Sequence, residues 1–313
     1  MGRLIFVPQY PTKLRYQEWW ISLFQDNLQT CFEKVITLGK VEAGNIAFGQ
    51  DFAPFTQSIQ FELLQIEEYL ALELLPGDIL LLNDLSYPGL FSQVLLHKRP
   101  SKCFAICHAT SKNKYDYFAK DRNIKYPIEK ATSKLFTKIF VGSNYHAKKL
   151  GWDNVEVAPL PFPPMKPYEG LAEHARPYKL VTVSRRGIQK HNMHLEKEIE
   201  SLLNLHINTK SFDNWFSYYR FLGHAQVLLI TSKEETYGYQ VIDAVKNGCI
   251  PIAPAKYSYP ELLPPEYLYT DKTDLVIKLK QALTGELSVP TLLVEETQKE
   301  FFNILINEFK NNA

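Results

Sequence analysis

The sequence is poor in cysteine and has no long apolar run. Its cysteines are Cys31, Cys103, Cys107 and Cys249, and no second closely spaced pair stands beside Cys103 and Cys107 to complete a zinc site. So few scattered thiols exclude a disulfide-stapled scaffold, and we expect them to be reduced in a cytoplasmic protein. Because no apolar run approaches the roughly 20 residues that cross a bilayer, no transmembrane segment is expected. The short apolar stretch at the N-terminus stops at Pro8, which predicts a first strand and not a signal peptide.

The composition also lacks the biases of disordered or fibrous chains. Hydrophobic residues make up 45% of the sequence and charged residues 22%, which excludes disorder and collagen-like repeats. A length of 313 residues is enough for two domains with separate cores. Short apolar runs alternate with amphipathic stretches along the chain, which is typical of βα units and parallel sheets.

This alternation predicts an α/β fold made of two Rossmann-like halves. In the first half, strands are expected at 4–8, 34–39, 78–84, 103–108, 138–143 and 155–161, and helices at 18–32 and 58–74. In the second half, strands are expected at 179–184, 209–212, 227–232 and 249–254, and helices at 195–205, 238–247 and 295–312. Four prolines between residues 161 and 167 predict a linker, because such a run forms neither helix nor central strand. The expected organisation is an N-terminal domain at 1–163, a linker at 164–177, a C-terminal domain at 178–294 and a final helix at 295–313.

Positive charge is concentrated in one segment of the first half. The net charge of the chain is only +1, but residues 98–149 contain thirteen basic and three acidic residues. A solvated basic face would explain this excess. A groove that binds nucleic acid would also explain it, because bases stack on aromatic rings beside cationic side chains. The aromatic residues interleaved with the charges are Tyr115, Tyr117, Phe118, Tyr126 and Tyr145.

A strand, a polar turn and a short helix in the second half carry the most informative pattern. The strand 227–232 is followed by a turn, and a helix is expected to open near Gly238 and to stop at Gly248. The N-terminus of a helix that follows the carboxyl end of a strand binds phosphate readily. Glu235 lies at the mouth of this helix, and Asp243 lies about two turns deeper. Each carboxylate can accept hydrogen bonds from a different sugar hydroxyl of a nucleotide-sugar.

These residues resemble the donor-site signature of the family 4 retaining glycosyltransferases. The matched positions are Glu235, Tyr237, Gly238, Asp243, Ala244, Gly248 and Pro251. The resemblance implies a GT-B fold, in which two Rossmann-like domains face a central cleft and the C-terminal one binds the donor. It also implies that Glu235 contacts the transferred sugar and that Asp243 grips the ribose. Tyr237 stands where the family has Phe, and Asp243 stands where it has Glu, so the ribose contact has a shorter reach.

A pair of cations upstream extends the resemblance. Arg185 follows the strand 179–184, and Lys190 comes five residues later. The family places an Arg and a Lys with this spacing on the donor diphosphate, where they neutralise the charge on the leaving group. Arg186 competes with Arg185 for that role. Since a cationic pair can do this alone, we expect neither a metal nor another cofactor, and the nucleotide-diphosphate sugar is a co-substrate.

The segment 255–271 resembles one narrower group of enzymes. Its Tyr259-Pro260-Glu261 run and the Tyr-Leu-Tyr that follows are similar to the corresponding part of the tRNA-queuosine mannosyltransferases. Part of the likeness is shared with bacteriophage enzymes that glycosylate modified DNA bases. This resemblance implies that Tyr259 and Glu261 lie near the sugar or base of the donor.

The N-terminal half is expected to hold the acceptor, on loops that follow its strands. Arg15 and Tyr16 follow the first strand, Asp84 follows the DILLL run of the strand 78–84, and His108 ends the strand 103–108. His108 is a candidate catalytic residue at the donor sugar, although a lone histidine is more often structural. The remaining acceptor-binding candidates are Lys112 and Lys114.

The sequence thus predicts a retaining glycosyltransferase that moves a hexose or pentose to a hydroxyl group. The basic segment favours a modified nucleobase in DNA or tRNA as the acceptor. The same fold would also serve a cell-envelope or small-molecule acceptor, where a basic face would meet anionic lipid. A nucleotide-sugar 2-epimerase and a non-catalytic nucleotide-sugar sensor are further alternatives. The first would need additional acids and histidines near the anomeric carbon, and the second would bind donor without turnover.

Overall fold

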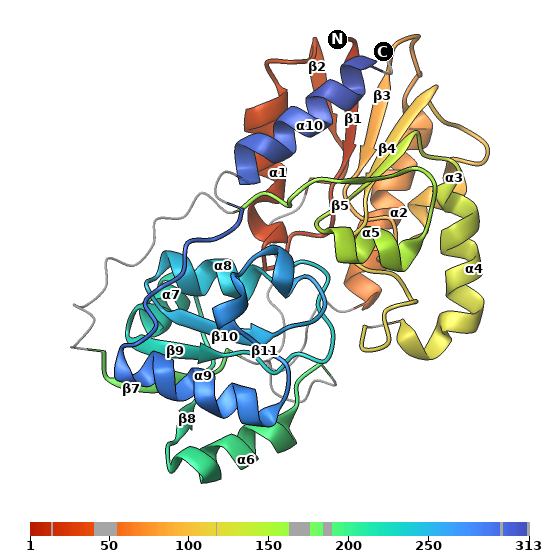
Figure 1. The fold of residues 1–313 in the computed structure, drawn as a ribbon. Helices are drawn as coiled ribbons and strands as arrows, with labels where there is room; N and C mark the ends of the chain where they lie inside the picture. Colours follow the sequence, from red (N-terminus) through yellow and green to blue (C-terminus); the bar gives the residue numbers. More distant parts are fainter. Residues whose placement is uncertain are drawn as a thin grey trace. The chain divides into compact units, whose positions relative to one another are not determined.

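The chain folds as two α/β units. The computed structural model describes residues 1–13, 15–40, 55–116, 118–162, 176–183, 190–294 and 297–311. Unit 1 comprises Met1–Pro163 together with Glu296–Ala313, and unit 2 comprises Pro164–Glu295 (Figure 1). The predicted linker at 164–177 lies almost entirely outside the described residues. Each unit is described below by itself.

Unit 1 is built on a six-stranded parallel sheet with the strand order β2-β1-β3-β4-β5-β6. Its strands are β1 (Arg3–Val7), β2 (Lys34–Thr37), β3 (Ile79–Leu82), β4 (Lys102–Ile106), β5 (Lys138–Val141) and β6 (Val155–Val157). In β3 all four residues are buried, as expected of a central strand that is covered on both faces. All six strands were predicted from their apolar runs, each ending earlier than expected.

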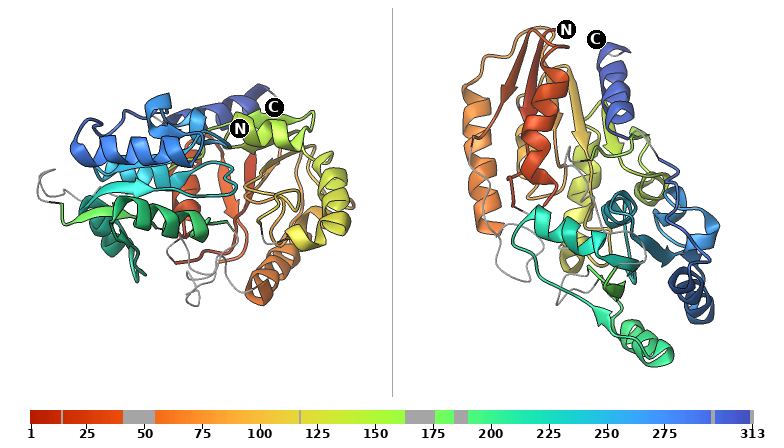
Figure 2. Two further views of the ribbon diagram at one scale, coloured as in Figure 1. Left: turned by 60° about the horizontal axis from the view of Figure 1, so that its bottom comes forward. Right: turned by 90° about the vertical axis from the view of Figure 1, so that its left-hand side faces the viewer.

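Helices cover both faces of this sheet. They are α1 (Gln17–Leu28), α2 (Phe55–Ala71), α3 (Phe91–Val94), α4 (Arg122–Ser133), α5 (Asn144–Leu150) and α10 (Thr297–Asn311). Figure 2 shows α1 and α2 on opposite sides of the strands. On the α2 side, Ile5 and Val7 pack in one cluster with Tyr69 and Phe91. The alternation of side chains along β1 therefore divides the core into two layers.

The second layer is aromatic and joins the two ends of unit 1. Phe24 of α1 stacks on Phe6 at 5.0 Å between ring centroids and meets Phe301 and Phe302 of α10 at 5.7 and 5.2 Å. Phe309 of α10 lies 4.7 Å from the Phe104 ring, edge-to-face. The final helix, which was predicted as a separate element, is thus part of the core of unit 1.

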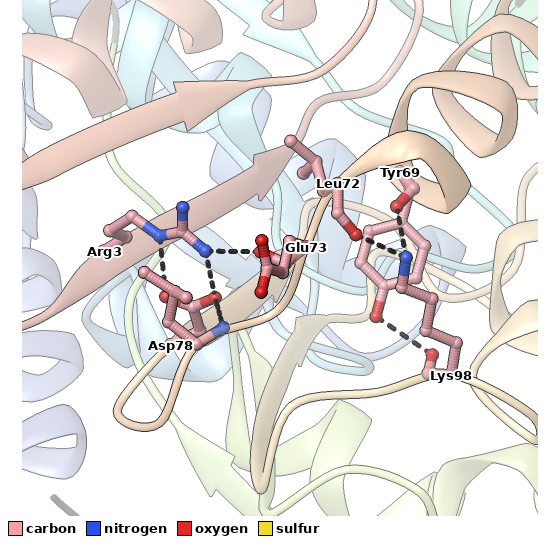
Figure 3. A network of polar contacts seen from close by, with 7 residues as sticks. Arg3, Tyr69, Leu72, Glu73, Asp78 and Lys98 are labelled. Carbon is pink, nitrogen blue, oxygen red and sulfur yellow. Dashed lines mark hydrogen bonds and ion pairs between the residues drawn. The ribbon is translucent and has the colours of Figure 1, made fainter.

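Polar contacts hold the edge of unit 1 from which the strands start (Figure 3). Arg3, the first residue of β1, binds the carboxylate of Asp78 through two nitrogens at 2.9 and 2.7 Å. This ion pair holds the pKa of Asp78 below its usual range, although burial opposes that shift. The ammonium group of Lys98 donates hydrogen bonds to the carbonyl oxygens of Tyr69, Leu70 and Leu72. A lysine at this end of α2 satisfies carbonyls that the helix leaves open.

Unit 2 is built on a five-stranded parallel sheet with the strand order β11-β10-β9-β7-β8. Its strands are β7 (Tyr178–Val181), β8 (Ile207–Asn208), β9 (Ala225–Leu229), β10 (Ile250–Pro254) and β11 (Leu268–Tyr269). Its helices are α6 (Met193–Leu203), α7 (Trp215–Gly223), α8 (Tyr239–Lys246) and α9 (Lys272–Thr284), with short 3-10 turns at Tyr259–Glu261 and Pro265–Tyr267. The strand expected at 209–212 was wrong: β8 ends at Asn208, and the residues after it lead into α7.

The α/β class and the two parallel sheets are confirmed. The four cysteines are free thiols, and all but Cys31 are buried. Within the described ranges, no helix is both long and apolar enough to cross a membrane.

Candidate functional site

The loop after β9 in unit 2 carries the predicted sugar-binding acid. Glu235 is half-buried there, and its Oε1 accepts hydrogen bonds from the backbone amides of Thr236 and Tyr237 at 2.9 and 3.3 Å. Among the described residues, no group donates to its Oε2. Two backbone donors fix the direction of the carboxylate, so one oxygen is anchored while the other can bind a ligand hydroxyl.

Gly238 caps the N-terminus of α8 with a backbone that only glycine adopts without strain. Its φ is +105°, and a Cβ atom at this position would lie 2.9 Å from Leu262 Cδ1 and 3.3 Å from Tyr259 Cε1. Tyr259 is completely buried, and burial raises the pKa of its hydroxyl. Gln240 donates to the Tyr259 hydroxyl at 3.4 Å. Tyr259 therefore packs against the start of α8, and its predicted place near the sugar or base of the donor stays a prediction.

Asp243 is buried in α8 and held by two tyrosines of α7. Its Oδ2 accepts from the Tyr218 hydroxyl at 3.0 Å, and its Oδ1 accepts from the Tyr219 hydroxyl at 3.3 Å. Burial, reinforced by the carboxylate, raises the pKa of Tyr219, so this hydroxyl remains a donor. Tyr218 and Tyr219 belong to no motif that was recognised in the sequence. Only their hydrogen bonds to Asp243 in the structure identify them.

Backbone pairing brings Lys190 to the same loop as Glu235. The carbonyl of Lys190 accepts from the amide of Lys233 at 2.6 Å, and His191 forms a bridge with Ser232. The segment after β7 is therefore joined to the loop after β9, at the carboxyl edge of the unit 2 sheet. Arg185 and Arg186 lie outside the described residues. Of the remaining predicted donor residues, Tyr237 is buried and Glu261 is half-buried at the end of a 3-10 turn.

Unit 1 contains a pocket at the carboxyl ends of β1 and β3, called the unit 1 pocket below. It is a small pocket that is partly open to solvent. Its lining residues come from the loop after β1, from α2 and from the loop after β3: Pro8, Gln9, Tyr10, Thr12, Arg15, Gln17, Ser58, Phe61, Glu62, Gln65, Leu82, Asp84, Tyr87 and Pro88. Two predicted acceptor residues, Arg15 and Asp84, thus share one pocket.

Asp84 is a buried acid of this pocket. Its Oδ1 accepts from the amide of Ser86 at 2.9 Å, and its Oδ2 accepts from the Gln9 side chain. Burial raises the pKa of Asp84 to about 8, while the Ser86 amide and the charge of Lys125 oppose the shift. A carboxyl group that titrates near neutral pH can accept or donate a hydrogen bond, which is typical of functional sites.

His108 lies next to the same strand end. Its Nε2 is 3.0 Å from the carbonyl oxygen of Asn83, and its ring meets Trp20 edge-on at 4.8 Å. Burial lowers the pKa of His108 to about 4, so the ring is neutral near pH 7. The neutral ring donates its Nε2 proton to this carbonyl. This hydrogen bond fixes the loop before Asp84.

The other predicted acceptor residues lie elsewhere in unit 1. Tyr16 packs on Trp19 at 6.5 Å. Lys112 donates to the carbonyl of Lys149 at 2.6 Å and sits 5.3 Å above the Tyr126 ring. Lys114 sits 5.4 Å above the Tyr115 ring. Several aromatic rings of the basic segment are thus covered by lysines of the same chain, while Lys114 remains exposed.

Sequence reasoning missed the polar side of α2 that lines the pocket. Ser58, Glu62 and Gln65 recur at i, i+4 and i+7 and share one face of the helix, and all three are buried. Glu62 accepts from the amides of Leu90 and Phe91, both at 2.9 Å. The signal was available, because polar residues at the positions that should face the core break the expected apolar stripe.

Comparison with known proteins supports the fold and includes a local likeness in sequence. No protein-family model matches the chain. Over 62 residues, or 20% of its length, the chain is 37% identical to the tRNA-queuosine alpha-mannosyltransferase of Drosophila melanogaster, and this match spans only 16% of the fly protein.

Three solved structures are similar over nearly the whole chain. Sucrose-phosphate synthase from Thermosynechococcus elongatus has a TM-score of 0.60 at 12% identity, covering 99% of this chain and 94% of that one. The E. coli trehalose-6-phosphate protein bound with UDP-2-fluoro glucose has a TM-score of 0.59 at 12% identity, covering 99% and 96%. AviGT4, a glycosyltransferase involved in Avilamycin A biosynthesis, has a TM-score of 0.55 at 12% identity, covering 99% and 97%. The chain therefore has the predicted GT-B fold with its C-terminal helix.

Proposed function

We propose that this protein is a glycosyltransferase whose unit 2 binds a nucleoside-diphosphate sugar. The sugar is transferred with retention to a hydroxyl group of a modified nucleobase in DNA or tRNA. The bond between the anomeric carbon and the diphosphate breaks, and its electron pair leaves with the diphosphate. The acceptor oxygen bonds to the same face of the sugar, and its proton passes to the departing phosphate oxygen. No metal or other cofactor takes part in this scheme.

The donor site is the part of the proposal with the strongest support. The supporting observation is that one loop and one short helix hold Glu235, Gly238 and Asp243 at the carboxyl edge of the unit 2 sheet. In open α/β sheets, ligands bind at this edge. In the proposed complex, Oε2 of Glu235 binds a sugar hydroxyl, and Asp243 binds the ribose in the orientation that Tyr218 and Tyr219 impose.

Charge on the leaving group is the main obstacle to this reaction. We assign its neutralisation to Lys190, with Arg185 or Arg186 as the second cation. The backbone pairing of Lys190 with Lys233 supports this role, because it brings the lysine to the loop that carries Glu235. Cations that are placed before the bond breaks stabilise the departing diphosphate without further reorganisation.

A nucleic-acid acceptor is supported by charge and by the local sequence likeness. Exposed basic residues of the segment 98–149 lie on unit 1, and they are Arg99, Lys114, Lys120, Arg122, Lys130, Lys134 and Lys148. Such residues bind phosphate groups and make the affinity depend on salt. The likeness to a tRNA-queuosine alpha-mannosyltransferase favours tRNA as the first acceptor to test.

Thermal-shift screening with nucleotide-sugars tests the donor site. We expect at least one of UDP-glucose, UDP-N-acetylglucosamine and GDP-mannose to raise the melting temperature, since a ligand that binds only the folded state stabilises it. Glu235→Ala and Lys190→Ala should abolish the shift. The matched controls Glu286→Ala and Lys210→Ala, at exposed positions of unit 2, should keep it. Equal shifts in all four variants would disprove the donor site assignment.

Mass spectrometry of the product tests the acceptor. The protein is incubated with the best donor and either total tRNA or DNA that contains hydroxymethylated bases, and the nucleosides are analysed after digestion. We expect a nucleoside whose mass has increased by one sugar, and its loss in Glu235→Ala. Transfer to lipid or to a small molecule in place of both nucleic acids would disprove the acceptor assignment. So would an unchanged affinity for tRNA after Lys114 and Lys120 are both replaced by glutamine.

A further inference from the structure

The unit 1 pocket contains buried polar atoms that lack partners. The hydroxyl of Ser58, a residue that is only 1% exposed, makes no hydrogen bond to any described residue, and neither does Oε1 of Gln9. Both side chains line the pocket. A buried polar atom without a partner costs free energy, so native structures satisfy nearly all of them with protein, water or ligand. The two atoms in this pocket therefore need partners that the described residues do not supply.

The polar groups of the pocket specify what a ligand of this pocket carries. Oε1 of Gln9 can only accept a hydrogen bond, and Ser58 can accept or donate one. Both oxygens of Asp84 already accept hydrogen bonds, one from the Ser86 amide and one from the Gln9 side chain. Glu62 is occupied by two backbone amides, and Lys125 donates to the carbonyl of Pro88 at 2.8 Å. A ligand that reaches Oε1 of Gln9 must therefore supply a donor such as an amino, ring N–H or hydroxyl group.

Aromatic side chains form much of the remaining wall. Tyr10 meets Phe61 edge-on at 5.5 Å between ring centroids. Tyr87 belongs to a second aromatic group, in which its ring lies 6.0 Å from Phe55 and 5.8 Å from Phe118. Aromatic side chains that face a pocket suit a flat ring, since every base has a π-face on which such side chains can stack.

We propose that the unit 1 pocket binds the acceptor through a flat heterocycle that bears amino or hydroxyl donors, with Gln9 and Ser58 as its hydrogen-bond partners. This inference rests on the proposed function, because it places the acceptor base of that reaction. It adds two binding residues, Gln9 and Ser58, that no sequence pattern identified. Arg15 lines the same pocket.

Saturation-transfer NMR with free nucleosides tests this pocket directly. The full chain is titrated with adenosine, guanosine, cytidine and uridine, and with myo-inositol as a donor-rich ligand without an aromatic ring. Each sample contains the nucleoside diphosphate of the best donor at saturation, so that the base site of unit 2 is filled. We expect at least one amino-bearing nucleoside to bind, and its affinity to fall at least tenfold in Gln9→Leu and in Ser58→Val. The exposed unit 1 controls Gln93→Leu and Ser101→Val should bind as the unmodified chain does.

Several outcomes would overturn the proposal. They are the absence of binding by all four nucleosides, an equal affinity in both pocket variants, and tighter binding of myo-inositol than of every nucleoside. If a pocket variant fails to fold, the unmodified chain labelled with ¹⁵N-glutamine gives a second measurement, because the side-chain amide signal of Gln9 should move on addition of the nucleoside. A nucleotide-sugar thermal shift that persists while nucleosides fail to bind would reject the pocket and leave the donor site standing.

Discussion

Replacement of Asp84 by asparagine should make unit 1 more stable near neutral pH. Burial raises the pKa of this carboxyl group to about 8, with smaller raising contributions from Asp116 and Glu129, while the Ser86 amide and Lys125 lower it. In the unfolded chain the pKa of an aspartate is about 3.9. Between these values the folded protein keeps a proton that the unfolded chain has lost. Stability from this group is therefore fully present at low pH and is lost as the pH rises toward 8.

The size of the effect follows from the separation of the two pKa values. Each pH unit between them costs about 1.4 kcal/mol, so the contribution of Asp84 to the free energy of unfolding should fall by about 3 kcal/mol between about pH 5 and pH 7. Asparagine cannot ionise and lacks this slope. Its amide can also donate to Oε1 of Gln9, which has no partner among the described residues.

Urea unfolding at several pH values, followed by tryptophan fluorescence, measures this difference. Three of the four tryptophans, Trp19, Trp20 and Trp152, belong to unit 1. Burial lowers the pKa values of His108 and His146 to about 4 and about 3. The free energy of unfolding therefore also falls on acidification because of these histidines, in the variant as in the unmodified chain. Subtracting the two pH profiles removes their contribution. Parallel profiles for the variant and the unmodified chain would show that Asp84 ionises normally and would refute the argument.

Three further substitutions test other parts of the structure. Lys98→Met should lower the free energy of unfolding by about 1–2 kcal/mol, measured by chemical denaturation, because carbonyls at the end of α2 lose their donor; no loss would mean that water replaces the ammonium. Gly238→Ala should cost more than about 1 kcal/mol, since the left-handed backbone is strained by any Cβ and Leu262 is too close to it; an unchanged melting temperature would contradict this. Tyr218→Phe should weaken nucleotide-sugar binding several-fold in a thermal-shift titration without unfolding unit 2, because one donor to Asp243 is lost, and an unaltered affinity would show that Asp243 does not touch the ligand.

The parts of the fold that were predictable are those whose pattern is local. Strands such as β3 and β4 are continuous apolar runs buried on both faces, and they are visible in the sequence for that reason. Helix α4 escaped prediction because Pro127 lies inside it and proline usually marks a boundary. Helix α7 escaped because its Trp, Phe and Tyr residues are as common in strands as in helices. Strand β8 has only two residues, which is too few for any periodicity.

The candidate sites divide in the same way. The motif around Glu235 and Asp243 is contiguous, so its residue types and spacing could be recognised without a structure. The partners of those residues could not, because Tyr218 reaches Asp243 only through the packing of α7 on α8. Asp84 was found since it follows a predicted strand, whereas Gln9 and Ser58 join it only when α2 and the loop after β1 are placed around the end of β3.

The chain returns to unit 1 after it has formed unit 2. Unit 1 can therefore finish folding only after unit 2 has been synthesised. Helix α10 supplies Phe301, Phe302 and Phe309 to the aromatic layer that Phe24 and Phe104 begin. During translation this layer has to wait while all of unit 2 is synthesised, so an apolar face of the first sheet stays uncovered on the ribosome. Unit 2 is thus an insertion within unit 1. Removal of the last helix would damage unit 1, whereas unit 2, whose strands all lie between the two parts of unit 1 in the sequence, would keep its own sheet.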